Sequence, residues 1–322
     1  MMKPSCCGVA LVLVIFSFFP LLFCGCERQE QQEADAVSHD PQQEVFKTQQ
    51  QISVLFFSDT QADPETGDYS SFGELLALAL THQEAPDLVI FGGDTVNDGG
   101  DADEWREFWE AAMPLTCLTT AAVPGNHDNN TLLARQFDYP IKEPASQGEG
   151  FFYSISQGPV HFIMLDSNTM GAANDRDIAW LRDDLGSTEA RQAVWRVAVI
   201  HHPMWLISDN PKDAARAETM REFFLPLLEE YGVDLILCGH QHVYARSLPM
   251  SGDLAPEDGS GIVQIMAASG GKGPYAAGDS EHVLASADVP VYLHLAADDE
   301  SLTITTYNAS GEPVDYYAAM RR

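Results

Sequence analysis

Short apolar runs recur along this chain from residue 52, and most are continuous rather than alternating in polarity. A strand that is apolar at successive positions is one that other elements cover on both faces, as in the parallel sheets of α/β proteins. The runs predict strands at Ile52–Phe57, Leu88–Phe91, Leu118–Val123, His161–Asp166, Trp195–Ile200, Val233–Cys238 and Ile262–Ala267.

The stretches between these runs have apolar residues at helical spacing. In one of them Trp105, Phe108 and Trp109 share a face, which is typical of packing against a core. The predicted helices are Ser71–Gln83, Ala102–Met113, Asp177–Asp184 and Asp213–Tyr231.

The end of the chain has a different pattern. Leu302–Tyr307 and Val314–Tyr317 flank a turn-rich segment, which predicts a β-hairpin. No internal repeat or linker interrupts residues 51–322. The alternation of strands and helices therefore predicts one layered α/β domain over 51–322.

Polar residues directly follow five of the predicted strands. In open α/β sheets, ligands bind beyond the carboxyl ends of the strands, so we expect these residues to converge on one crevice. The five segments are Ser58-Asp59-Thr60-Gln61, Gly92-Gly93-Asp94-Thr95-Val96-Asn97, Pro124-Gly125-Asn126-His127-Asp128, His201-His202-Pro203 and Gly239-His240-Gln241-His242.

The residue types in these segments suit a pair of metal ions. His240 and His242 are two apart, which puts them on one side of an extended segment, and Asp59 and Gln61 repeat that spacing. A carboxylate at Asp94 can bridge two cations, which two-metal sites hold about 3.5–4 Å apart. Imidazole, carboxylate and amide oxygen together suit Mn, Fe or Zn.

Each segment also has a structural explanation. An Asp at a strand end is commonly a turn or N-cap residue, and His201-His202 could be a surface pair. Turn formation does not explain all five segments in order.

Tyr244 and Arg246 have two interpretations. Either they face the site, where Arg246 could bind a phosphate, or they pack under the loop that contains His240 and His242.

Two later segments carry weaker signals. Ser269 lacks the glycine two residues earlier that a nucleophile elbow needs, so its segment is interpreted as a turn. Gly270-Gly271-Lys272-Gly273 lacks the spacing of a phosphate-binding P-loop.

The five segments resemble the motifs of the calcineurin-like metallophosphoesterases, which are D-x-H, G-D-x-x-D/N, G-N-H-D/E, a later His and G-H-x-H in this order. The resemblance covers roughly 52–322. The segments Phe151–Ser154, Trp180-Leu181, Gly239–Arg246 and Ser269–Gly271 look like the purple-acid-phosphatase-like branch. The family fold, a four-layer αββα sandwich of two mixed sheets flanked by helices, is the fold we expect.

The resemblance also implies roles for individual residues. One metal would be held by Asp59, Gln61, Asp94 and His242, and the other by Asp94, Asn126, His201 and His240. In the family a metal-bridging hydroxide attacks phosphorus in line, and the role of general acid falls on His127. Asn97 stands where relatives often place an acid that orients this histidine.

Two departures from the family pattern affect the metals. Gln61 stands where the family usually has His, and its neutral amide oxygen is a weaker ligand that suits a harder ion such as Mn. Purple enzymes also use a Tyr ligand shortly after the G-D, and residues 94–100 contain none. The sequence therefore predicts a centre without the tyrosinate-to-iron colour.

The charge balance bears on the partner. The chain has 17 Lys and Arg against 48 Asp and Glu, a net charge of −31. A nucleic-acid binder needs a basic surface to neutralise phosphates, so we expect no nucleic acid as a binding partner. A small phosphorylated substrate is the expected ligand, and the sequence does not indicate the oligomeric state.

The N-terminus has the features of a targeting segment. Lys3 precedes the apolar stretch Gly8–Phe23, which Pro20 interrupts and which is short for a membrane span. With the Gly25-Cys26 pair that follows, it resembles a bacterial lipoprotein signal at residues 1–25 with lipidation of Cys26. An uncleaved anchor or an ordinary secretory signal are the alternatives. Residues 26–50, rich in Gln and acids, predict a flexible tether to the cell envelope, outside the cytoplasm.

Two cysteines remain in the predicted domain, Cys117 and Cys238, and both lie in apolar runs. They could form one disulfide in an oxidising compartment, but buried free thiols are the favoured interpretation.

These observations predict a lipid-anchored metallophosphoesterase. Phosphomonoesters are favoured over diesters because of the purple-phosphatase-like segments. The alternative is a non-catalytic envelope protein of the same fold that binds a phosphorylated ligand or partner, for which Gln61 is the support. The presence of His127 favours the enzyme, because its expected role is purely chemical.

Overall fold

The computed structural model describes residues 51–83, 85–128, 130–138, 151–208, 210–273 and 280–321. The predicted signal peptide at 1–25, the lipidated Cys26 and the tether at 26–50 lie outside these ranges. In the part of the chain that the structure describes, no helix is both long and apolar enough to cross a membrane.

Six strands form the first sheet, in the order β13-β12-β11-β1-β2-β3. The first three strands of the chain run parallel to one another, and the three C-terminal strands join them antiparallel through the pairing of β1 with β11. The bounds are β1 Ile52–Phe57, β2 Leu88–Phe91, β3 Thr120–Ala122, β11 Val291–Ala297, β12 Ser301–Asn308 and β13 Pro313–Met320. The predicted C-terminal hairpin is the β12–β13 pair.

Seven strands form the second sheet, in the order β10-β8-β9-β7-β6-β5-β4. The strands β5, β6, β7 and β9 are parallel, whereas the outer strands pair antiparallel. The bounds are β4 Tyr153–Gln157, β5 Val160–Met164, β6 Trp195–Val199, β7 Leu235–Cys238, β8 Tyr244–Ser247, β9 Val263–Met266 and β10 Val283–Ala287.

Several of the helices begin after a residue whose side chain accepts a hydrogen bond from the first turn. Asp101 accepts a hydrogen bond from the backbone N–H of Asp103 at the start of α2, and Asn210 precedes Pro211 at the start of α7. The bounds are α1 Ser70–His82, α2 Ala102–Ala111, the 3-10 helix η1 Met113–Cys117, α3 Asn130–Leu133, α4 Ser167–Met170, α5 Asp175–Leu185, α6 Thr188–Gln192, α7 Pro211–Phe223 and α8 Leu225–Glu230.

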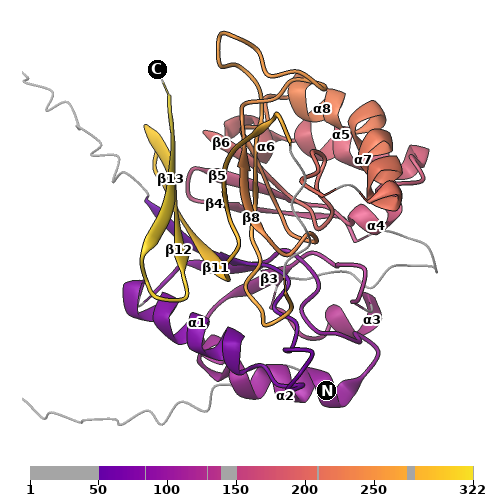
Figure 1. Ribbon diagram of the computed structural model, residues 1–322. Helices are drawn as coiled ribbons and strands as arrows, with labels where there is room; N and C mark the ends of the chain where they lie inside the picture. Colours follow the sequence, from indigo (N-terminus) through magenta and orange to yellow (C-terminus); the bar gives the residue numbers. More distant parts are fainter. Residues whose placement is uncertain are drawn as a thin grey trace, which may run out of the picture. The chain divides into compact units, whose positions relative to one another are not determined.

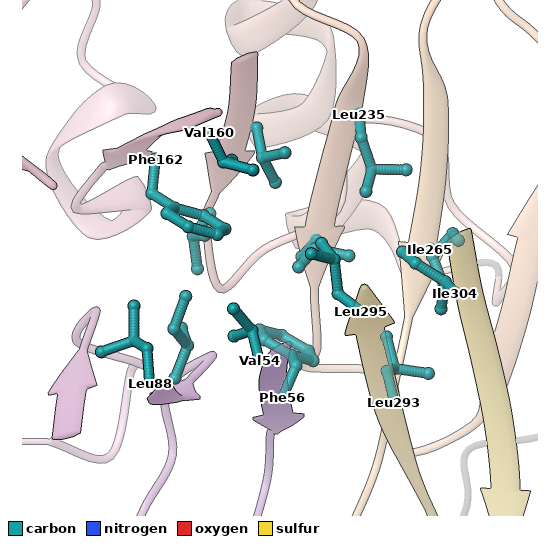
Figure 2. Close-up of a cluster of buried hydrophobic side chains, with 14 of the residues drawn as sticks. Val54, Phe56, Leu88, Val160, Phe162, Leu235, Ile265, Leu293, Leu295 and Ile304 are labelled. Carbon is teal, nitrogen blue, oxygen red and sulfur yellow. The ribbon is translucent and has the colours of Figure 1, made fainter. Parts of the chain in front are cut away.

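The two sheets pack face to face, and helices cover both outer faces. Between the sheets, Val54 and Leu293 of the first sheet meet Phe162 and Leu235 of the second in a fully buried apolar layer (Figure 2). Helices α1 and α2 cover the first sheet, and α5, α7 and α8 cover the second (Figure 1). The predicted four-layer αββα sandwich of two mixed sheets is confirmed.

Some element boundaries differ from those predicted. The helix expected over Asp213–Tyr231 is two helices, α7 and α8. Pro226 lies in the first turn of α8, and a proline has no N–H for a continuous helix. Four strands, β4, β8, β10 and β11, were not predicted. Polar residues interrupt their apolar pattern, as His294 does in β11.

The cysteine prediction is correct for one residue. Cys238 at the end of β7 is buried and free. Cys117 is exposed, so the prediction of a buried residue is wrong for it. Its segment ends as a 3-10 turn rather than continuing into the apolar strand.

Candidate metal centre

The five polar segments meet at the carboxyl ends of strands from both sheets. Backbone hydrogen bonds tie neighbouring segments together: the N–H of Asp59 donates to Gly93 at 3.0 Å, and the N–H of Gly239 donates to His201 at 3.0 Å. The carboxylate of Asp59 also accepts a hydrogen bond from the backbone N–H of His240 at 2.8 Å. The structure thus brings the ends of β1, β2, β6 and β7 to one place.

Four of the predicted ligands have an unusual backbone. Asp59, Asp94, His240 and His242 have φ values of 50°, 50°, 78° and 51°. Residues other than glycine rarely adopt this left-handed conformation, which costs about 1–3 kcal/mol at each position and concentrates at functional sites. This conformation turns the backbone sharply in the segments that follow the strands.

Two glycines allow the segments to approach closely. A Cβ at Gly239 would lie 2.1 Å from Oδ2 of Asp59, and one at Gly125 would lie 2.2 Å from Oδ1 of Asp94. No side chain fits at either position, so the glycines beside the predicted ligands have a steric role in the site.

Two buried carboxylate–imidazole pairs form the centre of the site. Oδ2 of Asp94 lies 3.3 Å from Nε2 of His201, and Oδ1 of Asp59 lies 3.4 Å from Nε2 of His242. Potential ligand atoms of Asp59, Asp94 and His201 all lie within 4.8 Å of one another. A group of this size can surround one cation.

The electrostatics couple these groups. Burial acts to raise the pKa of Asp94, but the His201 imidazole and the backbone N–H of His127 outweigh it and hold this pKa well below the usual range. For His201, burial acts to lower the pKa, and the carboxylates of Asp94 and Asp59 raise it to about 9. The carboxylates therefore favour a positive charge at this position.

Oδ1 of Asp59, Oε1 of Gln61 and Nε2 of His201 are buried, and none of these atoms has a hydrogen-bond partner among the described residues. Leaving such an atom unsatisfied costs about 1–3 kcal/mol, more where the group is charged. A metal ion would satisfy all three. The residues present therefore fit a metal centre, and Gln61 takes part through its amide oxygen.

The other ring nitrogens of the histidines have fixed partners. Nδ1 of His201 donates to the backbone oxygen of Gly92 at 2.9 Å, and Nδ1 of His242 donates to that of Gly273 at 3.2 Å. Nε2 of His240 lies 3.0 Å from Oδ1 of Asp213. These contacts orient each ring and set its tautomer, as outer groups do around metal-binding histidines.

Asn126 and His127 lie in the turn that follows β3. The backbone N–H of His127 donates to Oδ1 of Asp94 at 2.8 Å, and its Nδ1 donates to the backbone oxygen of Asn97 at 2.7 Å. Asn97 thus orients His127 through its carbonyl group rather than its side chain. Asn126 is exposed, and no hydrogen bond between described residues joins its amide to Asp94.

The next residue in this turn, Asp128, was not assigned a role from the sequence. Its carboxylate accepts hydrogen bonds from the backbone N–H groups of Gly125 and Thr95, at 2.9 and 3.2 Å. Burial and the negative charge of Asp94 raise the pKa of Asp128 to about 7. Asp128 joins the turn after β3 to the turn after β2.

Sequence reasoning also missed Asp213, which it predicted only as the start of a helix. Asp213 lies in the first turn of α7 and is buried against His240. The signal that could have found it is an acid in the first turn of a helix that follows the His201-His202 segment.

His202 is not part of a surface pair, because both histidines are buried. Its ring lies 4.3 Å from that of His240, and its Nδ1 is 2.8 Å from Oγ of Ser167. Burial, together with the nearby His201, His240 and Arg216, holds the pKa of His202 far below its ordinary value. His202 is therefore a neutral packing partner for the ring of His240.

The weaker candidates lie away from this centre or are structural. Tyr244 and Arg246 both bond Asp315 on β13, with Nη2 of Arg246 at 3.0 Å from Oδ1, so neither faces the site. Ser269 is buried and its hydroxyl donates to the backbone oxygen of Val291 at 2.7 Å, as expected for a turn. His161 pairs with Asp184 at 3.0 Å and is structural.

Comparison with known proteins gives one family. The family model for calcineurin-like phosphoesterase matches residues 52–244, which is more than half of the chain. The chain is 30% identical over 152 residues to purple acid phosphatase 23 of Arabidopsis thaliana, covering 45% of this chain and 32% of that protein. It is 31% identical over 169 residues to the probable glycerophosphodiester phosphodiesterase GpdQ of Arcobacter nitrofigilis, covering 51% and 59%.

A solved structure agrees in fold. Purple acid phosphatase PPD1 from yellow lupin (Lupinus luteus) seeds superposes with a TM-score of 0.70 at 18% identity, covering 85% of this chain and 54% of that one. The chain spans less than two thirds of the length of these relatives. The match over 52–244 includes all five polar segments, and the chain belongs to the calcineurin-like phosphoesterase family.

Proposed function

We propose that this protein hydrolyses small phosphate esters with two metal ions held at the carboxyl ends of strands from both sheets. The observation that carries the proposal is a set of buried atoms that have no hydrogen-bond partner in the described parts of the chain, Oδ1 of Asp59, Oε1 of Gln61 and Nε2 of His201. These atoms lie at positions that the family motifs assign to ligands, in a chain whose family is named for phosphoesterases.

The ligands divide into two sets that share one residue. Asp59, Gln61, Asp94 and His242 would hold one metal, and Asp94, Asn126, His201 and His240 would hold the other. A bridging role for Asp94 is supported by the distance of its ligand atom from those of Asp59 and His201, one from each set, because all three lie within 4.8 Å of one another. The donor set of oxygen and imidazole nitrogen suits Mn, Fe or Zn.

When bound, the metals would supply an activated water and neutralise the phosphoryl oxygens. His127 then acts as general acid towards the ester oxygen that leaves. Because Nδ1–H of His127 donates to the backbone oxygen of Asn97, Nε2 is the atom that carries the proton to the substrate. Asn97 keeps that nitrogen directed into the site.

A phosphomonoester is the favoured substrate. Its support is the similarity to purple acid phosphatase 23, whereas the similarity to a probable glycerophosphodiester phosphodiesterase keeps diesters as the second possibility. The net charge of −31 argues against long nucleic acids, which need a basic surface.

Hydrolysis assays on the purified full chain test the proposal. We expect turnover of p-nitrophenyl phosphate, and a smaller rate with bis-p-nitrophenyl phosphate, when Mn is supplied. His127→Ala serves as the matched variant of lower activity and should keep its metal. If the wild type binds phosphate and metal but hydrolyses neither ester, the protein is instead a non-catalytic phosphate-binding member of the family.

We also propose that the chain acts at the bacterial cell envelope as a lipoprotein. The support is the sequence around Cys26, which follows Gly25 and an apolar stretch. Metabolic labelling with an alkyne fatty acid in a bacterial host should mark the wild type and not Cys26→Ser. Equal labelling of both proteins would contradict lipidation at Cys26.

A further inference from the structure

A loop outside the five polar segments lies against one side of the candidate metal centre. Residues 269–273 follow β9 and lie along the segment after β1. The N–H of Ser269 donates to Ser58 at 2.8 Å, and the N–H of Gly271 donates to Gln61 at 3.2 Å. A Cβ at Gly270 would lie 2.4 Å from the backbone oxygen of Asp59, so only glycine fits there. The loop is therefore held tightly against two of the proposed ligands.

This anchoring puts Lys272 beside the proposed general acid. Its Nζ lies 3.5 Å from Nε2 of His127, the nitrogen that faces away from the backbone oxygen of Asn97. The backbone oxygen of the next residue, Gly273, accepts the hydrogen bond from His242. Lys272 thus lies on the same side of the site as Nε2 of His127.

In the described parts of the chain, Lys272 forms no ion pair, although acidic residues outnumber basic ones by 48 to 17. It lines a cavity of about 250 Å³ together with His242, Asp63 and Asp288, and no ion pair between described residues joins its ammonium group to either acid. A half-buried ammonium beside a cavity is placed to meet an anion that enters from solvent.

We propose that Lys272 is a specificity-determining residue that binds a non-bridging oxygen of a phosphomonoester dianion. The proposal rests on the proposed function and names the substrate class of the same site. Because Nε2 of His127 meets the leaving oxygen, a cation 3.5 Å away lies beside other substituents of the same phosphorus. A phosphomonoester has three non-bridging oxygens that share its negative charge. A phosphodiester has only two, because its third remaining oxygen carries an alkyl or aryl group. Lys272 therefore favours the monoester.

The test uses the full chain and compares two lysine variants with the wild type. Lys272→Met removes the charge and keeps the length of the side chain, and Lys272→Arg keeps the charge. Lys212→Met is the matched control, because Lys212 is exposed at the start of α7. We measure kcat/KM for p-nitrophenyl phosphate and for bis-p-nitrophenyl phosphate, and the metal content of each protein.

We expect Lys272→Met to lower kcat/KM for the monoester about 30-fold and for the diester no more than about threefold, with unchanged metal content. Lys272→Arg should recover much of the monoester rate, and Lys212→Met should match the wild type. An equal fall for both esters, or no fall for either, would overturn the role in specificity.

Binding of inorganic phosphate, measured by calorimetry on the metal-loaded proteins, separates this proposal from the proposed function. We expect phosphate to bind Lys272→Met about tenfold more weakly than Lys212→Met. If the wild type hydrolyses neither ester, the proposed function is wrong. The phosphate affinities would then still show whether Lys272 contacts the anion. Equal affinities in the two variants would overturn the contact between Lys272 and the anion.

Discussion

Asp213 and His240 are joined side chain to side chain across 27 residues of sequence, with Oδ1 of the acid 3.0 Å from Nε2 of the imidazole. The pair links the first turn of α7 to the loop after β7, and both side chains are nearly buried. Burial acts to raise the pKa of Asp213, but the hydrogen bond from His240 outweighs it and lowers this pKa. A charged Asp213 holds the proton of His240 on Nε2, so a metal on this ring binds through Nδ1.

Removal of Asp213 should weaken metal binding more than it weakens the fold. We expect Asp213→Ala to lower the affinity for the second metal by about 10–100-fold, because the His240 ring loses its orientation and its fixed tautomer. Glu218→Gln, an exposed position on the same helix, is the matched control. Metal titration followed by elemental analysis measures the effect. Wild-type affinity in Asp213→Ala would show that the pair is only structural.

Loss of His127 should affect turnover and not metal content. His127→Ala should lower kcat by about 10²–10⁴-fold, the usual contribution of a general acid, because no side chain then supplies the leaving oxygen with a proton. The loss should be smallest for esters with an acidic leaving group, which need less protonation. A rate series over substituted phenyl phosphates measures this. An equal fall in kcat for every ester of the series would show that His127 is not the general acid.

The amide oxygen of Gln61 should determine occupancy of one metal site. Gln61→Leu keeps the side-chain volume and removes Oε1, so we expect one metal in place of two. Gln61→His supplies an imidazole, and we expect metal at this site to be held about tenfold or more tightly. Gln192→Leu, exposed on α6, is the control. Two tightly held metals in Gln61→Leu would mean that Gln61 is no ligand.

The ion pair of Arg246 with Asp315 should contribute stability only above acidic pH. Burial acts to raise the pKa of Asp315, but hydrogen bonds from Arg246 and Tyr244 outweigh it and lower this pKa below the ordinary value of an aspartate. The contribution is therefore complete above about pH 4 and is lost as pH falls through the lower pKa of the folded state. We expect Asp315→Asn to lower the free energy of unfolding by about 2 kcal/mol at pH 7.

Denaturant unfolding at pH 7 and at pH 3 measures that contribution. The difference between the wild type and Asp315→Asn should shrink at pH 3, because the wild-type carboxyl group then begins to take up a proton. Asp299→Asn, in an exposed turn next to β12, should match the wild type at both values. A difference that grows towards pH 3 would contradict the sign of the pKa shift.

Much of the fold could be predicted because the buried strands are continuous apolar runs. The bounds of β1 and β2 agree with the prediction at both ends, since Ser58 follows Phe57 and a pair of glycines follows Phe91. The outer strands could not be found in this way. In β10 the side chains alternate between half-buried and exposed, so the strand has no apolar run.

The residues of the candidate site also divide into those that a local sequence pattern could predict and those that it could not. Asp59, Asp94 and His201 could be predicted because each follows a strand, and parallel strands bring their carboxyl ends together. Asp213 and Lys272 could not, because their contacts with His240 and His127 depend on how a helix and a loop pack across long sequence separations. Local patterns contain no record of such contacts.

The count of metal ions per chain tests the central claim most directly. The measurement is elemental analysis of the full chain, purified without added histidines and equilibrated with Mn, for the wild type and for Asp94→Asn. We expect about two metals per chain in the wild type. In Asp94→Asn, which loses the bridging carboxylate, we expect fewer than one. Two metals retained in Asp94→Asn, or none bound by the wild type, would contradict a two-metal centre bridged by Asp94.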